Sequence, residues 1–315
     1  MQASLRRNLI LLTMTTVIVA GLGLFLGPIG LPDRYILLNV RLPRVLLGLL
    51  VGCGLAGSGT VFQGILRNPL ADPFILGTSS AATVGVLVAN LLGWHNYYAL
   101  YFMALGFALS SIAFVYRIAQ THGKAPIQTM VLGGVIVSLF FNAVVFVFFS
   151  IFYRDSFTIL FYLLGTLTGG DPKLMVISGA FILLSLAVCW AMSRELNGLT
   201  QGEETAFHLG IEVETAKKIL FVAASAMAAA SVAVAGMIGF VGLVVPHMMR
   251  LIVGPDHRWL IPASALGGAS VLVLTDSAAR TVVPPLEIPV GALTALLGVP
   301  YFLYLLKQRQ DAGEF

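Results

Sequence analysis

The sequence predicts an all-α, polytopic membrane protein with ten transmembrane helices, formed by one domain over residues 1–315. Hydrophobic residues make up 58% of the 315 positions and charged residues only 10%, whereas soluble domains carry about 25% charged residues. Apolar runs of about 20 residues, the length that a helix needs to cross the hydrocarbon layer, recur along the chain. Because these runs are continuous rather than alternating, they favour helices over the strands of a membrane β-barrel.

The expected spans start near the N-terminus and continue almost to the end of the chain. They cover residues 9–27, 44–64, 74–93, 99–119, 127–152, 174–193, 218–239, 241–253, 259–279 and 288–306. The first run follows Arg6 and Arg7 and could be read as a signal peptide, but it is long for one and no small-x-small cleavage site follows it. We therefore expect a retained first helix.

One stretch decides between nine and ten spans. Residues Ile219 to Gly254 are apolar and too long for one crossing, and three glycines and Pro246 interrupt them. Lys and Arg favour the cytoplasmic side of a membrane. Ten spans with a cytoplasmic N-terminus place twelve of the 18 Lys and Arg residues inside and six outside, whereas nine spans divide them equally. Ten spans are therefore predicted, with both termini in the cytoplasm.

The six outward basic residues are Arg34, Arg41, Arg44, Arg154, Lys173 and Arg280. Arg41 and Arg44 flank Pro43 at the start of the second span, where a cation opposes both the topology bias and the positive end of the helix dipole. Two explanations are open: an anionic partner outside the membrane, or snorkelling to lipid phosphates. Arg280 lies four positions after Asp276, so the two can pair on one helical face, which does not exclude an outside partner.

Motifs for covalent chemistry and for metal binding are missing from the sequence. No phosphate-binding G-x-x-x-x-G-K-[ST] motif is present, and the five histidines lack metal-ligand spacing. Cys53 and Cys189 lie in apolar runs, where a thiol behaves as a small hydrophobe, and His247 fits a hydrogen-bonded structural histidine better than a proton relay. We predict no catalytic residues, no metal and no cofactor in this chain. Membrane topology, rather than nucleic acid, explains the net charge of +4.

The second span and the segment after it carry small and helix-breaking residues. The span contains Gly48, Gly52, Gly54, Gly57 and Gly59, and small faces allow membrane helices to approach closely, which favours packing over a ligand site. The following segment, RNPLADP at residues 67–73, contains two prolines. Since non-helical backbone is tolerated at membrane depth only beside protein or water, we expect this segment at the cytoplasmic mouth of a pathway.

A long charged loop joins the sixth and seventh spans, over residues 197–218. Its pattern predicts a helix from Glu203 to Leu209 that Gly210 ends. Ala206, Phe207 and Leu209 are expected on one side and acidic residues on the other, which suits docking to a protein. The alternative, lying flat on lipid, is disfavoured because acidic side chains are repelled by anionic headgroups.

Six groups of residues, in this order along nearly the whole chain, carry a family resemblance. They are RLPR at 41–44, NPLADPFILGTSSAA at 68–82, GEETAFHLG at 202–210, GFVGLVVPHMMRL at 239–251, DHR at 256–258, and DSAAR at 276–280 followed by LEIPVGALTALLGVPYFLYLL at 286–306. The chain resembles the FecCD/BtuC-type permeases of type II ABC importers, which carry vitamin B12, ferric siderophores or haem.

The resemblance implies an ABC type II importer permease fold in the plasma (inner) membrane of a prokaryote. It implies a homodimer around the translocation pathway, two ATP-binding cassette subunits that hold ATP and magnesium inside, and a substrate-binding protein outside. By residue match it assigns binding-protein docking to Arg41, Arg44 and Arg280. It assigns ATPase coupling to the loop helix at Glu203, Glu204, Ala206, Phe207, Leu209 and Gly210, and, on a looser match, a cytoplasmic gate to Ser79, Ser80 and Gln128.

These implications predict a transporter subunit that performs no covalent chemistry. The main alternative is a stand-alone ion-coupled secondary carrier, although such a carrier is expected to bury more ionisable groups near the midplane. A membrane-embedded enzyme is a third possibility, but the sequence shows no cluster of catalytic side chains. Transport that needs an ATPase and a binding protein would separate the importer from the stand-alone carrier.

Overall fold

The computed structural model describes residues 2–27, 32–120, 125–151, 162–168, 171–284 and 286–311. Within these ranges the regular structure is helical and no strand occurs. The helices are α1 (Gln2–Phe25), α2 (Arg34–Ile36), η1 (Leu37–Arg41), α3 (Leu42–Ile65), η2 (Pro73–Leu76), α4 (Thr78–Leu91), α5 (Tyr97–Ala119), α6 (Ile127–Ile151), α8 (Pro172–Ala191), α9 (Ser193–Thr200), α10 (Glu203–His208), α11 (Val213–Ala235), α12 (Val241–Val253), α13 (His257–Thr281) and α14 (Val290–Asp311).

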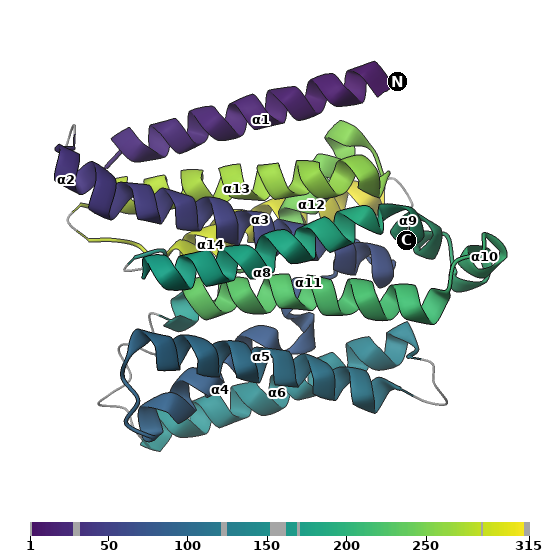
Figure 1. Cartoon of the computed structure of the whole chain (residues 1–315), viewed down its shortest axis with the longest axis horizontal. Helices are drawn as coiled ribbons and strands as arrows, with labels where there is room; N and C mark the ends of the chain where they lie inside the picture. The colour runs from purple at the N-terminus through teal and green to yellow at the C-terminus, as the bar shows by residue number, and fades with distance from the viewer. Residues whose placement is uncertain are drawn as a thin grey trace.

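The long helices lie roughly side by side, as a membrane bundle requires (Figure 1). In the described part of the chain, seven helical segments are long and apolar enough to cross a membrane, and the apolar helices Thr78–Leu91, Val241–Val253 and Val290–Tyr304 are shorter. Each expected span falls on one of these segments. The positions of the apolar helices are therefore confirmed, while the count of ten crossings stays a prediction.

The bundle has a central helix and two exposed margins. Helix α3 packs against α8, α11, α12 and α13, and 78% of its most apolar window is buried. Helix α1 lies along one margin and α4, α5 and α6 lie along the other (Figure 1). In the most apolar 18-residue stretch of each helix, only 17% of the residues are buried in α1 and 22% in α6. The core therefore lies around α3, while α1 and α6 expose most of their apolar side chains.

Glycines allow α3 to touch its neighbours backbone to backbone. A Cβ atom on Gly52 would collide with the carbonyl of Gly268 on α13, and one on Gly59 would collide with the carbonyl of Gly242 on α12. Such close approach is the reason for small residues at membrane helix interfaces. The packing role that the sequence predicts for these glycines is therefore confirmed.

Gly59→Ala is expected to lower the melting temperature of the detergent-solubilised protein, because the new methyl group meets backbone that cannot move aside. Overpacking of this kind costs roughly 1–3 kcal/mol or more. Gly106→Ala on α5 is the matched control, since no heavy atom lies within 4 Å of the added Cβ. Equal melting temperatures for the two variants would show that α3 and α12 separate at little cost.

The apolar stretch from Ile219 to Gly254 is two helices, as its loop charges predict. Helix α11 ends at Ala235 and α12 begins at Val241, and between them Gly236 and Phe240 have φ values of 72° and 68°. Phe240 is an unusual residue in this left-handed region, and a Cβ on Gly298 of α14 would touch its ring. The 13 residues of α12 extend about 20 Å, which is less than the roughly 30 Å of a hydrocarbon core.

The proline-containing segment after α3 folds back into the protein. Asp72 accepts a hydrogen bond from the Phe74 amide at 2.7 Å and so caps η2. Pro73 and Leu76 are buried, and the Leu76 carbonyl accepts a hydrogen bond from Ser111 on α5 at 3.1 Å. The part from Ala71 to Leu76 is therefore largely covered by protein, whereas Arg67, Asn68 and Leu70 are exposed.

Candidate functional site

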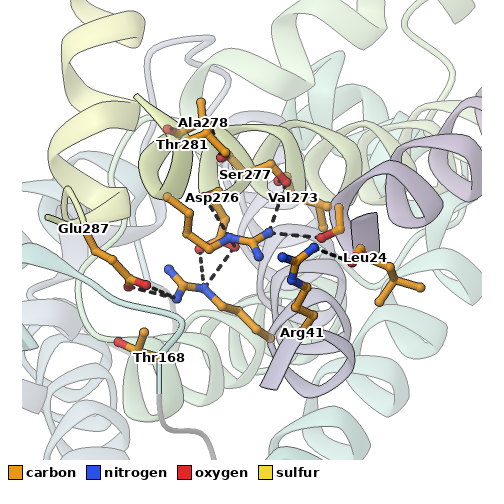
Figure 2. Close-up of polar contacts among 12 residues, drawn as sticks. Leu24, Arg41, Thr168, Val273, Asp276, Ser277, Ala278, Thr281 and Glu287 are labelled. Carbon is orange, nitrogen blue, oxygen red and sulfur yellow. Dashed lines mark hydrogen bonds and ion pairs between the residues drawn. The ribbon is translucent and has the colours of Figure 1, made fainter. Parts of the chain in front are cut away.

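Three of the six basic residues predicted on the outer side gather with two carboxylates in one group. This group, here named the outer cluster, consists of Arg41, Arg44, Asp276, Arg280 and Glu287. Figure 2 shows Asp276 between guanidinium groups, with Glu287 on the far side of one of them. The Arg44 Nε atom lies 2.9 Å and 3.1 Å from the two carboxylate oxygens of Asp276. The other branch of the same guanidinium lies 2.9 Å from Glu287. Arg44 therefore ties α3 to both α13 and the segment before α14.

Two arginines of the outer cluster cap the end of α1. Arg41 donates hydrogen bonds to the carbonyls of Leu24 at 3.0 Å and Phe25 at 2.7 Å. Arg280 pairs with Asp276 at 3.1 Å and also donates to the carbonyl of Gly23 at 3.2 Å. The last carbonyls of a helix have no intrahelical donor and carry its negative dipole end. These two cations therefore fasten the otherwise exposed helix α1 to the bundle.

Local backbone explains how Arg41 reaches α1. Arg41 ends the π-helical turn η1 (Leu37–Arg41), and α3 follows directly with Pro43 in its first turn. Proline lacks an N–H, so the regular hydrogen-bond ladder is interrupted there. π-turns of this kind change the direction of a side chain inside a helix and are frequent at functional sites.

The burial of the outer cluster changes the interpretation of its charges. The pairing of Asp276 with Arg280 is confirmed, but Arg41, Arg44 and Arg280 are no more than 7% exposed. Their charges already have partners inside the protein. The position of Arg41 and Arg44 at the positive end of a helix dipole therefore does not by itself require an external anion. Docking stays a prediction for these three arginines. Arg34 and Lys173 are exposed, and Arg154 lies outside the described residues.

The loop between the sixth and seventh spans contains the helix that the sequence predicts there. Helix α10 runs from Glu203 to His208, between Gly202 and Gly210 in positive-φ conformations of 122° and 78°. Phe207 and Leu209 are 71% and 60% exposed, and Glu204 is exposed beside them. Helix α10 protrudes at one end of the molecule (Figure 1). The protruding apolar pair is suited to binding a protein surface.

Two details of this helix correct the sequence interpretation. Ala206 is fully buried in the core cluster that includes Leu196 and Leu199 of α9, so it does not share a face with Phe207 and Leu209. Glu203 is half-buried and accepts a hydrogen bond from Lys217 at 3.0 Å. Helical spacing alone does not predict these contacts. The six-residue helix lies on α9 and buries the side that an isolated helix would expose.

A broad hollow of about 890 Å³ lies beside α10. Glu203, Glu204, Phe207 and Gly210 line it together with residues 211–215. The apolar ring of Phe207 and the surrounding carboxylates give this surface both an anchor and a charge. Such a combination is typical of a protein interface with a buried aromatic centre.

The residues matched to a cytoplasmic gate do not converge in the structure. Ser79 and Ser80 are buried in the first turn of α4, where the Ser80 hydroxyl donates to the Gly77 carbonyl at 3.3 Å. Gly77 faces Ser138 of α6, whereas Gln128 is exposed in the first turn of α6. Gln128 therefore lies about 15 Å along the helix from the part of α6 that α4 meets. Their gate role stays a prediction.

The remaining polar motif, DHR at 256–258, has structural contacts. Asp256 caps α13 and accepts a hydrogen bond from Asn197 at 2.7 Å. His257 is buried and shares a hydrogen bond of 2.7 Å with the other side of the Asn197 amide. Among the described residues no group of three or more His, Cys, Asp or Glu could hold a metal ion. These contacts fix α9 against the start of α13.

Comparison with known proteins assigns this architecture to a family. The model of the FecCD transport family matches residues 8–308. The chain belongs to the FecCD transport family. FecCD proteins are membrane permease components of ABC importers, so the chain is a transporter subunit of the inner membrane rather than a catalyst.

Several FecCD relatives have known cargoes. The chain is 43% identical to the cobalamin import system permease BtuC of Halobacterium salinarum, over 89% of this chain and 76% of the relative. It is 41% identical to the hemin transport system permease HmuU of Yersinia pestis, over 88% and 85%. A solved inward-facing metal-chelate type ABC transporter superimposes with a TM-score of 0.88 at 32% identity, covering 96% of this chain and 99% of the other.

Two pairings at the site are not predicted from the sequence. They join Glu287 to Arg44 and Lys217 to Glu203 of α10. Both pairings join residues from different elements of the fold, so no spacing along the chain predicts them. The signal that could have been used is the presence of isolated charges in an otherwise apolar chain, since such charges need partners.

Proposed function

We propose that this chain is the permease subunit of an ATP-driven importer for a large metal chelate, such as a ferric siderophore, haem or cobalamin. Two copies enclose the pathway at a two-fold axis, and each crosses the membrane ten times with both termini in the cytoplasm. Membership of the FecCD family and the cargoes of its cobalamin and hemin relatives support this assignment. The chain itself holds no ATP, magnesium or metal in this proposal.

The observation that carries the proposal is the apolar pair Phe207 and Leu209, exposed on a short helix at the end of the bundle. A carrier that works alone has no use for such a surface in water, whereas an ATPase subunit gains a docking point from it. ATP binding then brings two ATPase subunits together, and α10 passes their movement to the membrane helices. The ATPase activity resides in that separate subunit.

A substrate-binding protein docks on the opposite side. The outer cluster holds three arginines and two carboxylates, so acidic residues on the lobes of a binding protein would meet a positive excess. Arg41, Arg44 and Arg280 are the proposed docking residues. Because all three are buried, docking through them acts by their summed potential together with exposed groups such as Arg34 rather than by extended side chains.

Reconstitution in proteoliposomes tests the proposal. Vesicles carry the permease with its ATPase and ATP on the inner face, and the binding protein with radiolabelled ferric siderophore, haem or cobalamin is added outside. We expect uptake of one of these chelates only when all three proteins and ATP are present. Uptake driven by a proton or sodium gradient through the permease alone would establish the alternative, a secondary carrier.

A further inference from the structure

Lys217 is a buried lysine at the base of α11. Its side chain is 3% exposed, although lysine is almost never fully buried unless it is paired. The Nζ atom lies 2.7 Å from Glu214 and 3.0 Å from Glu203, and it donates to the Ala125 carbonyl at 3.3 Å. The three N–H donors of the ammonium group therefore have three separate acceptors.

These acceptors belong to three different elements. Glu203 opens α10, Glu214 lies in the first turn of α11, and Ala125 lies two residues before the start of α6. The Ala125 amide also donates to Glu214 at 3.2 Å, so both backbone groups of Ala125 are fixed by the same pair. We name Glu203, Glu214, Lys217 and Ala125 the lysine junction. It joins the exposed helix α10 to the start of α6 through one ammonium group.

Helix α6 continues the connection into the bundle. It packs against α4, α5 and η2. A Cβ atom on Gly134 of α6 would touch the Ile75 carbonyl at 2.6 Å, and one on Gly77 would lie 3.2 Å from the Ser138 amide. A shift of α6 therefore acts on η2, which begins at the last residue of the segment 67–73 expected at the cytoplasmic mouth, and on the start of α4, where the gate residues Ser79 and Ser80 are predicted. Since most of α6 faces outward, few contacts with the rest of the bundle resist such a shift.

We propose that Lys217 is a positioning residue that transmits the displacement of α10 to α6. The inference deepens the proposed function and rests on it, because it takes the ATPase as the source of the displacement. The ammonium group of Lys217 is buried, while its carboxylate partners are partly exposed. Separating Lys217 from Glu203 therefore leaves a buried charge short of an acceptor, which resists the separation. When α10 moves, Glu203 pulls Lys217, and Lys217 pulls Ala125 and the N-terminus of α6.

Distances between spin labels at the same position of the two permease copies test this inference. Labels are placed at Gln128→Cys on α6 or His208→Cys on α10, in a protein whose Cys53 and Cys189 are replaced by Ala. The complex with the ATPase is measured without nucleotide and with trapped ATP. In the complex with native Lys217 we expect ATP to change both distances. In Lys217→Met we expect the α10 distance to change and the α6 distance to stay constant.

Transport is measured on the same complexes. Lys217→Met is expected to keep the ATPase bound and hydrolysing ATP while chelate uptake falls about tenfold, a loss within the usual range of coupling between sites. Lys217→Arg keeps the charge and should restore uptake and the α6 distance change. Glu214→Ala, at a side chain that is 33% exposed, removes the acceptor of the Ala125 amide and keeps the contacts of Lys217 with Glu203 and the Ala125 carbonyl. It should therefore weaken the α6 response, but less than Lys217→Met does.

The outcomes separate the inference from the proposed function. An unchanged α6 response and normal uptake in Lys217→Met and in Glu214→Ala would overturn the lysine junction alone. Failure of Lys217→Arg to restore either readout would also overturn it, since an amino acid with the same charge would then not replace the residue. Absence of any ATPase from the complex with native Lys217 would overturn the proposed function, and the inference with it.

Discussion

Phe207→Asp combined with Leu209→Asp is expected to remove the ATPase subunit and to abolish ATP-driven uptake. The two side chains are 71% and 60% exposed, and burying each in an apolar groove of a partner contributes about 1.5–3 kcal/mol. Aspartate replaces this gain with the cost of burying a charge. Because neither side chain belongs to the core of the bundle, the double variant should insert into the membrane and melt at the same temperature as the unaltered protein.

A charge-matched variant controls for the added aspartates. Thr200→Asp with Gln201→Asp places the same two charges at the exposed end of α9 and removes no apolar side chain. We expect this control to retain the ATPase. Copurification of the ATPase with the Phe207 and Leu209 double variant at normal stoichiometry would show that α10 is not the docking element. Uptake that persists without the ATPase would contradict the importer itself.

The sequence predicts the helices of this fold well, because crossing a membrane imposes a length and an apolar composition that can be counted. The division of Ile219–Gly254 is an example. Its glycines and proline show where a helix could break, and the charge balance of the loops shows that it must. The structure places the break between Ala235 and Val241. Physical constraints that act locally, or on loops as a whole, are readable from one sequence.

Contacts between distant residues are not readable in this way. Arg44 and Asp276 are separated by 232 positions and Arg44 and Glu287 by 243, so their pairing depends on how α3, α13 and the segment before α14 come together. The role of Arg41 in capping α1 likewise requires the π-turn η1 and the end of α1 to meet. The sequence leaves an outside anion and lipid phosphates as open explanations for Arg41 and Arg44, and it cannot show the partners within the protein that the fold brings to them.

The short loop helix shows a second limit. The pattern of Glu203–Gly210 correctly predicts a helix with an exposed apolar surface, but Ala206 is buried against α9 and Glu203 is drawn to Lys217. In a helix this short, the neighbouring elements rather than its own periodicity decide which side is covered. For a helix of only one or two turns, the structure is therefore needed to tell which residues are exposed for a partner and which are buried.

Arg44→Ala is expected to destabilise the protein more than truncation of any other arginine in the outer cluster. It leaves Glu287 without its ion pair at 2.9 Å and leaves Asp276 with Arg280 alone. Removing one partner of a buried pair costs roughly 3–5 kcal/mol. Arg280→Ala should cost less, since Asp276 keeps Arg44 and the main loss is the hydrogen bond to Gly23. Melting curves in detergent measure both, with the exposed Lys173→Ala as the control.

The same variants decide whether the outer cluster also docks a binding protein. A purely structural cluster predicts that Arg280→Ala, once folded, binds the external protein with normal affinity. Docking predicts weaker binding by the folded variant, and a loss that shrinks as salt is raised, because rim charges are screened over about 10 Å at 0.1 M. Charge reversal at Arg44 cannot make this distinction, since a glutamate there would face Asp276 and Glu287 and unfold the site.

Arg34→Glu can distinguish docking from a structural role. Arg34 is exposed, so its reversal changes the outer potential while the ion pairs of the cluster stay intact. Unchanged affinity in both Arg280→Ala and Arg34→Glu at low salt would confine the cluster to holding α1, α3 and α13 together.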